Sequence, residues 1–140
     1  MGKISIKTDV CSGCLACELS CSMRHFGYFD PQKSRIRIHH DEEHSIIEIH
    51  QCVQCVERSC VHACPVDALS IDPVLGCIRF NADLCIGCKK CYQACKYHGV
   101  MWDHETSQPL ICDLCDGDPE CVKPCKLHGA LTYSKKEDAV

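Results

Sequence analysis

Alternation of apolar and polar residues predicts short strands in the first third of the chain. Lys3–Lys7 alternates ahead of the first cysteine. Ser34–His39 and Ser45–His50 alternate in the same way on either side of the polar turn His40–His44. Because a period of two places alternate side chains on one face of a strand, the last two stretches are expected to form a hairpin.

Two further stretches predict a second hairpin, and a third predicts a closing strand. Ala68–Ile71 and Cys77–Phe80 flank the turn Asp72–Gly76, which contains proline and glycine. Near the end of the chain, Ala130–Tyr133 could pair with the N-terminal strand. The remaining tail, Ser134–Val140, is charged and is expected to fray.

Helical structure is expected only in short turns that follow the last cysteine of four cysteine-rich segments. These cysteines are Cys21, Cys64, Cys95 and Cys125. No apolar run approaches the roughly 20 residues needed to span a bilayer, so the sequence predicts no direct membrane insertion. Residues 1–10 contain no apolar targeting region and no twin arginine, which favours a cytoplasmic location.

The composition is dominated by cysteine, which makes up 17 of the 140 residues. An odd number of cysteines cannot pair fully into disulfides, and a reducing cytoplasm would keep such bridges open, so metal binding is the stronger interpretation. Only three Phe, four Tyr and one Trp are present, so the core is thin and metal binding must supply much of the free energy of folding. A formal net charge of −4 argues against nucleic acid as a partner.

Sixteen of the cysteines fall into four motifs. In the first and third motifs, successive cysteines are separated by two, two and three residues, which is the spacing by which bacterial ferredoxins hold a [4Fe–4S] cluster. The second and fourth motifs widen only the middle gap. The motifs are Cys11, Cys14, Cys17 and Cys21; Cys52, Cys55, Cys60 and Cys64; Cys85, Cys88, Cys91 and Cys95; and Cys112, Cys115, Cys121 and Cys125.

This spacing has a physical basis. Three thiolates on a tight loop can surround one cluster, and the loop amides can point at its sulfur atoms and offset their negative charge. The fourth cysteine is carried away from that cluster and binds the other cluster of a pair. Motifs therefore work in twos, and sixteen cysteines predict four [4Fe–4S] clusters.

Other cofactors and functions fit the sequence less well. Structural zinc is usually held by two separated pairs of cysteines, whereas each motif here contains four closely spaced cysteines. A redox-sensing regulator would need a DNA-binding element or an open coordination position, and the chain has neither a helix-turn-helix pattern nor a missing ligand. A freely diffusing polyferredoxin stays open as an alternative to a subunit of a larger complex.

The four motifs, together with Cys64–Leu69, resemble the four-cluster iron–sulfur subunits of molybdenum and tungsten oxidoreductases. The segments Cys14–Cys21 and Phe29–Ile36 most resemble the small subunit of tungsten aldehyde ferredoxin oxidoreductase complexes. This resemblance implies an α+β fold in which two bacterial-ferredoxin-like two-cluster units are nested in one compact chain. Residues 1–33 plus 108–140 would form the outer unit, and residues 34–107 the central unit with its leading hairpin.

The resemblance also implies how the motifs pair, the first with the fourth and the second with the third. Each cluster would take three ligands from one motif and the last cysteine of its partner. The implied ligand sets are Cys11, Cys14, Cys17 and Cys125; Cys112, Cys115, Cys121 and Cys21; Cys52, Cys55, Cys60 and Cys95; and Cys85, Cys88, Cys91 and Cys64.

The implied function is electron transfer through four clusters between a large tungsten- or molybdenum-pterin catalytic subunit and a redox partner, such as a flavin subunit or a soluble ferredoxin. A subunit of a formate dehydrogenase or hydrogenase type of complex is the alternative. The sequence holds no dinucleotide loop, phosphate loop or catalytic triad, so no catalytic site of its own is expected.

Several residues outside the ligand sets also have expected roles. Cys77 is the one cysteine outside the motifs and is expected to pack as a small apolar side chain. His98 and His128 recur three residues after the last cysteine of a motif and are expected to cap or pack a turn. Lys96 and Lys126 could place positive charge near a cluster. Four histidines are expected to be exposed on the first hairpin: His39, His40, His44 and His50.

Overall fold

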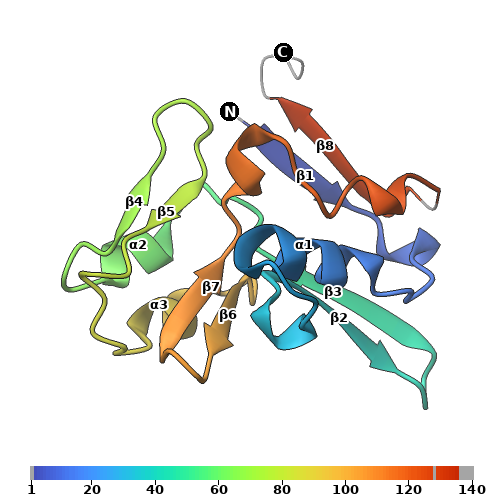
Figure 1. Cartoon of the computed structure of the whole chain (residues 1–140), viewed down its shortest axis with the longest axis horizontal. Coiled ribbons are helices and arrows are strands. Elements are labelled where there is room, and N and C mark those ends of the chain that lie inside the picture. The colour runs from blue at the N-terminus through green and yellow to red at the C-terminus, as the bar shows by residue number, and fades with distance from the viewer. Residues whose placement is uncertain (1, 128, 136–140) are drawn as a thin grey trace.

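The fold is an assembly of short antiparallel strand pairs and short helices, seen here in a computed structural model that describes residues 2–127 and 129–135. Each sheet in this part of the chain has two strands (Figure 1). The pairs are β1 (Gly2–Ile6) with β8 (Leu131–Lys135), β2 (Ile36–Asp41) with β3 (Ile46–Gln51), β4 (Leu69–Ile71) with β5 (Ile78–Phe80), and β6 (Val100–Asp103) with β7 (Gln108–Ile111). The α-helices are α1 (Ala16–Phe26), α2 (Ser59–Ala63) and α3 (Lys90–Ala94).

The strands predicted from alternation are confirmed. The first hairpin forms β2 and β3, with Ile38 opposite Ile49, and the second forms β4 and β5, with Ile71 opposite Ile78. The N-terminal and closing strands pair as β1 and β8, which lie side by side at the edge of the molecule where both ends of the described chain meet (Figure 1). The small mixed fold agrees with ferredoxin-like domains.

One hairpin was not predicted. β6 and β7 flank a polar turn in which Ser107 has a φ of 54°. Met101 and Trp102 are buried on β6. Pro109 pairs with Trp102. A proline in the sequence disfavours a central strand, but both strands of a two-stranded sheet are edge strands, where proline is tolerated.

The helical turn predicted after Cys21 is confirmed, because α1 contains Cys21 and continues beyond it to Phe26. The turns predicted after Cys64 and Cys95 are wrong, because α2 and α3 end immediately before these cysteines. The reason is that the third and fourth cysteines of each motif are four residues apart, about one helical turn. In the fourth motif, Cys125 lies within a 3₁₀ turn, Pro124–Leu127.

The end of the chain also differs in part from expectation. Residues 134 and 135 of the tail predicted to fray belong to β8. The rest of that segment, residues 136–140, lies outside the described residues.

Apolar side chains form two small cores. Ile4 of β1, Ile36 of β2 and Leu131 of β8 pack with Leu114 in the first core, whose buried members also include cysteines. The second core groups buried residues of α2, α3 and β4 to β7: Cys60, Leu69, Ile78, Cys91, Val100 and Ile111. Because cysteines make up part of both cores, packing and metal binding stabilise the same regions.

A buried ion pair joins the turn after α1 to β6. Lys33 and Asp103 are each 4% exposed, and Lys33 Nζ donates to the two carboxylate oxygens of Asp103 at 2.7 and 2.8 Å. Glu105 lies 3.1 Å from the same nitrogen. Burial alone raises the pKa of Asp103, but hydrogen bonds from Lys33 and Thr106 outweigh it and lower that pKa.

None of the helices in the described part of the chain is both long and apolar enough to cross a membrane.

The ion pair makes a prediction about stability. Lys33→Met should lower the melting temperature of the cluster-loaded protein, because it leaves the Asp103 carboxylate buried without its partner. The double variant Lys33→Met, Asp103→Leu should recover most of the loss, since it removes both charges. Circular dichroism melting under anaerobic conditions measures both. A double variant no more stable than the single one would contradict this account.

Candidate metal centres

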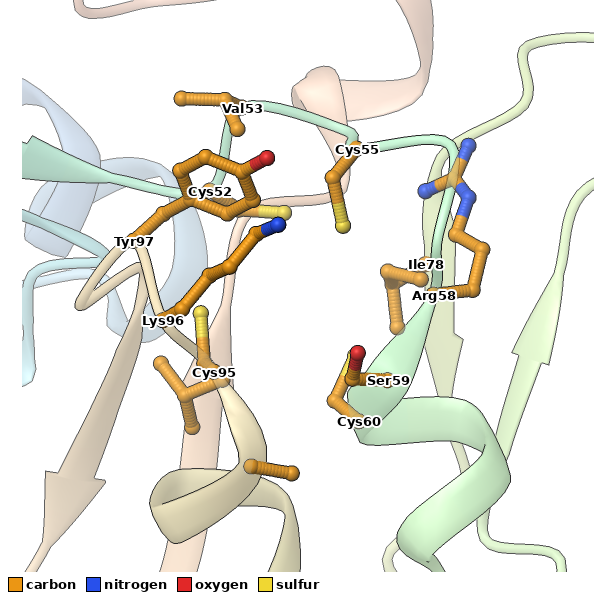
Figure 2. A pocket seen from close by; sticks show the side chains of 12 residues that line it. Cys52, Val53, Cys55, Arg58, Ser59, Cys60, Ile78, Cys95, Lys96 and Tyr97 are labelled. Atoms are coloured by element: carbon orange, nitrogen blue, oxygen red, sulfur yellow. The ribbon is translucent and has the colours of Figure 1, made fainter.

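Four cysteines from the second and third motifs line one apolar cavity. Cys52 follows β3, Cys60 lies in α2, and Cys95 directly follows α3, while Cys55 comes from the loop between β3 and α2. Figure 2 shows the sulfur atoms of Cys52, Cys55 and Cys95 pointing into a common space, with Cys60 at its edge. Three of these residues belong to one motif, and the other is the last cysteine of the next motif.

A second cavity contains the complementary set from the same two motifs. Cys64, directly after α2, lines it together with the cysteines that lead into and begin α3. α2 and α3 pack against each other. Each of them therefore carries cysteines to both cavities, one within the helix and one four residues later. The cysteines of the second cavity are Cys64, Cys85, Cys88 and Cys91.

The third cavity joins the two ends of the chain. Cys11, Cys14 and Cys17, from the first motif, line it together with Cys125 of the fourth motif. Side chains of the first hairpin and of β8 complete its apolar wall. The pairing of β1 with β8 brings these distant parts of the sequence together.

The remaining four motif cysteines are all buried: Cys21, Cys112, Cys115 and Cys121. Burial, followed by the nearby thiols of Cys21 and Cys115, raises the pKa of Cys121 to about 12. Cys21 also contributes to the raised pKa of Cys115, after burial. These electrostatic interactions indicate that Cys21 lies close to the cysteines of the fourth motif.

Each motif repeats one local backbone feature near its first cysteine. The residue two positions later has a positive φ in all four motifs, and its N–H faces the cysteine sulfur. The nitrogen–sulfur distance is 3.4 Å for Gly13, Gly87 and Leu114. Gln54 makes the equivalent hydrogen bond to Cys52 and lowers its pKa against the larger effect of burial. Such amides offset negative charge on sulfur.

The last cysteines of the second and third motifs also accept backbone hydrogen bonds. The N–H of Ala68 lies 3.3 Å from Cys64 Sγ, and that of Gly99 lies 3.3 Å from Cys95 Sγ. At Gly99 a side chain has no room, because its Cβ would lie 2.6 Å from the Cα of Cys52. Glycine at this position therefore allows the loop after α3 to approach the first cavity closely.

Burial strongly disfavours free thiolates at these sites. It raises the pKa of both Cys17 and Cys52 to about 12 and that of Cys91 to about 11. The thiols therefore hold their protons at neutral pH when no metal is bound, and a metal must displace them. Sulfur ligands, apolar walls and amides aimed at sulfur are the features that suit iron–sulfur clusters.

Two polar side chains beside the fourth group were not predicted from the sequence. Gln51 is 3% exposed, and its Nε2 lies 3.7 Å from Cys112 Sγ and 3.9 Å from Cys121 Sγ. His25 bridges Cys21 and Asp113, with Nδ1 2.9 Å from the Cys21 carbonyl and Nε2 3.1 Å from Asp113 Oδ1. Their positions follow from tertiary packing, since Gln51 stands 61 residues from Cys112 in the chain.

The His25–Asp113 pair is an electrostatic feature of this region. Burial lowers the pKa of His25, but hydrogen bonds to Asp113 and Cys21 outweigh it and raise the pKa to about 9. His25, Asp113 and Cys115 have potential ligand atoms within 4.8 Å of one another. Because Cys115 belongs to the fourth motif, His25 and Asp113 lie beside the buried cysteines of that motif.

The lysine expected to bring charge to a cluster has a carboxylate partner. Lys96 lines the first cavity, and its Nζ lies 2.7 Å from Glu57 Oε1. Tyr97 donates to the same oxygen at 3.2 Å, and Figure 2 shows Lys96 and Tyr97 together at the cavity. Glu57 thus offsets much of the lysine charge.

Cys77 and most of the hairpin histidines lie where the sequence predicted. Cys77 is fully buried in the first core, as predicted for a small apolar side chain. Three of the hairpin histidines are exposed, but His50 is half-buried and its ring lies 5.6 Å from that of His98. His98 occupies a turn position with a φ of 55°. The side chain of Lys126 and all of His128 lie outside the described residues.

The cysteine motifs coincide with two matches to known families. A family described as "4Fe-4S dicluster domain" matches residues 10–69, and a second family with the same description matches residues 43–135. The chain belongs to the 4Fe-4S dicluster domain proteins. Together with the sixteen motif cysteines, the two dicluster matches fit four [4Fe–4S] clusters as its cofactors.

Several curated proteins resemble this dicluster protein. The polyferredoxin-like subunit of an aliphatic sulfonate oxidoreductase from Pyrococcus furiosus is 45% identical over 93 residues, covering 66% of this chain and 53% of the relative. Formate hydrogenlyase subunit 2 from Escherichia coli strain K12 is 32% identical, covering 74% and 48%. The hydrogenase-2 operon protein HybA from Escherichia coli O157:H7 is 29% identical, covering 69% and 37%. The dicluster protein spans about half or less of the length of these relatives.

A solved structure extends the similarity over nearly the whole chain. A chain of the active site complex BamBC of benzoyl coenzyme A reductase, in complex with benzoyl-CoA, superposes with a TM-score of 0.55 and 27% identity. The match covers 96% of the dicluster protein and 79% of that chain. The dicluster protein is thus homologous to polyferredoxin-like subunits of oxidoreductases.

Gln51 yields a prediction about one reduction potential. N–H groups that face cysteine sulfur stabilise the reduced, more negative form of a cluster, so Gln51→Leu should lower the potential of a single cluster. The expected shift is on the order of tens of millivolts, since about 59 mV corresponds to a tenfold change for one electron. An EPR-monitored redox titration measures it. The exposed Gln32 offers the control Gln32→Leu, and equal potentials in all three proteins would exclude the proposed effect.

Proposed function

We propose that this protein is an electron-transfer subunit, carrying electrons through four [4Fe–4S] clusters between a tungsten or molybdenum oxidoreductase catalytic subunit and a redox partner. The observation that supports it most is the arrangement of cysteines in separate sites that share helices, because neighbouring clusters can pass electrons without moving atoms. The sulfonate oxidoreductase relative and the BamBC complex favour a catalytic partner of the oxidoreductase type.

Each cluster, in this proposal, takes three ligands from one motif and one from its partner motif. For three of the sets, support comes from the four cysteines that line each cavity, and for the fourth from the buried group around Cys121. The proposed sets are Cys11, Cys14, Cys17 and Cys125; Cys112, Cys115, Cys121 and Cys21; Cys52, Cys55, Cys60 and Cys95; and Cys85, Cys88, Cys91 and Cys64.

The same pairing supports a nested division of the chain. Residues 1–33 plus 108–140 would form the outer two-cluster unit and residues 34–107 the central one. The two units would share packing, because Ile36 and Cys77 of the central unit lie in the same core as Ile4 and Leu131.

A second candidate is an electron-transfer subunit of a hydrogenase or formate type of complex. The similarities to the hydrogenase-2 operon protein and to formate hydrogenlyase subunit 2 favour it. Both candidates assign electron transfer to this chain and differ only in the catalytic partner.

Co-purification tests the proposed function. Tagged protein isolated anaerobically from its native cells should bring down a large subunit, and the complex should contain tungsten or molybdenum by elemental analysis. A nickel-containing partner without either metal would support the hydrogenase candidate instead. Isolation of a four-cluster protein with no large partner would contradict both and leave a free polyferredoxin.

Substitution of one crossed ligand tests the proposed sets. Cys125→Ser should disturb the cluster of Cys11, Cys14 and Cys17, because that cluster would lose its only ligand from the fourth motif. Cys77→Ala is the matched control and should leave the iron content unchanged. Iron analysis and EPR of both variants measure the effect. Disturbance confined to the cluster of Cys112, Cys115 and Cys121 would show that the motifs do not exchange ligands.

A further inference from the structure

A groove with a volume of about 590 Å³ lies beside the cysteine sites of the second and third motifs. Residues of β2, β3, α3 and β6 and their loops line it. Five of its side chains are cationic or become so on protonation, and none of the described residues lining it is acidic. These five are Arg37, His50, Lys89, His98 and His104.

The cationic side chains of this groove are largely free of carboxylate partners. Among the described ion pairs, only His50 is matched, with Glu48 at 3.1 Å, and the charge of Arg37 also acts on the Glu18 carboxylate and lowers its pKa against the larger effect of burial. Arg37 donates instead to backbone carbonyls of Gln32 and Ser34. Lys89 lies over the ring of Trp102, with its Nζ 5.3 Å from the centroid. The groove therefore keeps positive charge that can interact with a negatively charged partner.

The positive charge of the groove is opposite in sign to the net charge of the whole molecule. The chain has a formal net charge of −4, and each oxidised cluster with four thiolates adds about two negative charges. A cationic groove on an acidic protein selects acidic partners and repels basic ones at this one place.

The groove also adjoins two of the cysteine cavities. Cys95 and Val100 line both the groove and the cavity of Cys52. Lys89 and Trp102 line both the groove and the cavity of Cys64. A molecule seated there would approach both central clusters, which gives the groove a direct relation to electron transfer.

We propose that this groove is the docking site for a small acidic electron-carrier protein of the ferredoxin type. The proposal rests on the proposed function, since it specifies the redox partner of the same electron-transfer chain. Tyr92, half exposed on α3, and Trp102 add the aromatic contact surface that protein interfaces favour. In each encounter the reduced carrier loses one electron and the cluster protein gains one, with no bond formed or broken.

Binding measurements test the docking site without relying on turnover. The probe is a purified acidic two-cluster ferredoxin, titrated anaerobically into the four-cluster protein by calorimetry at low and high salt. Affinity should fall with added salt, because exposed charges are screened. The double variant Lys89→Gln, His104→Glu should bind roughly tenfold more weakly than the unchanged protein, chiefly through slower association.

A matched control separates a local effect from net charge. Lys7 is exposed and lies outside the groove, and Lys7→Glu changes the formal net charge by two, as the double variant does. Lys7→Glu should therefore bind the ferredoxin as tightly as the unchanged protein. Iron content of every variant should equal that of the unchanged protein. Equal weakening by Lys7→Glu, or no weakening by the double variant, would overturn the docking site.

Other occupants of the groove would give different results. Tight binding of ATP or FMN that is lost in the double variant, with unchanged ferredoxin affinity, would assign the groove to a small anionic ligand. A salt-sensitive dimer that dissociates in the double variant would assign it to a second copy of the chain. Either result overturns the proposal. Loss of the large catalytic partner in co-purification, with ferredoxin binding intact, would contradict only the proposed function.

Discussion

The separation of the third and fourth cysteines of every motif by one helical turn is the constraint on which the structure depends. In α2 and α3 it places one sulfur in one cavity and the next in a neighbouring cavity, so that the two helices must pack together to complete either site. The same constraint acts on the chain ends. Cys125 lines a cavity with cysteines of the first motif, and this is possible only because β8 returns to pair with β1.

A second local rule is repeated in all four motifs, although the residues that follow it differ. Two residues after the first cysteine, the backbone adopts a positive φ and turns its N–H toward sulfur. Gly13 and Gly87 adopt this conformation without strain, whereas Gln54 and Leu114 do so at a conformational cost. Gln54 and Leu114 belong to the second and fourth motifs, which have the widened middle gap. The loops of these two motifs therefore depend more on metal binding and packing to keep their conformation.

These features explain which parts of the fold and site could be predicted from the sequence. Cysteine spacing and strand alternation are local signals, and they predicted the four motifs and the pairing of β1 with β8. The positions of α2 and α3 were predicted wrongly, because these helices were expected after Cys64 and Cys95, although the four-residue spacing of the last two cysteines already describes a helical turn. The hairpin of β6 and β7 was missed because its strands are short and one contains Pro109.

Contacts between distant residues could not be predicted from local patterns. From local sequence alone, Gln51 is expected at the end of a strand, Lys33 at the surface, and His25 at the polar end of a helix. Their partners Cys112, Asp103 and Asp113 stand 61, 70 and 88 residues away in the chain. Only the folded chain brings these partners together. All three contacts involve polar or charged groups, which are costly to bury without a partner.

Electrostatics connects the metal sites with the exterior of the protein. Burial raises the pKa of Cys17, Cys52 and Cys121, so these thiols hold their protons until metal displaces them. Amides, Gln51 and the His25 bridge then face the resulting negative charge from within the fold. At the surface, the cationic groove places positive groups beside the two central cavities, with which it shares lining residues. A protein that gathers negative charge in its buried metal sites thus keeps positive groups at their margin, which is where the proposed ferredoxin would exchange electrons.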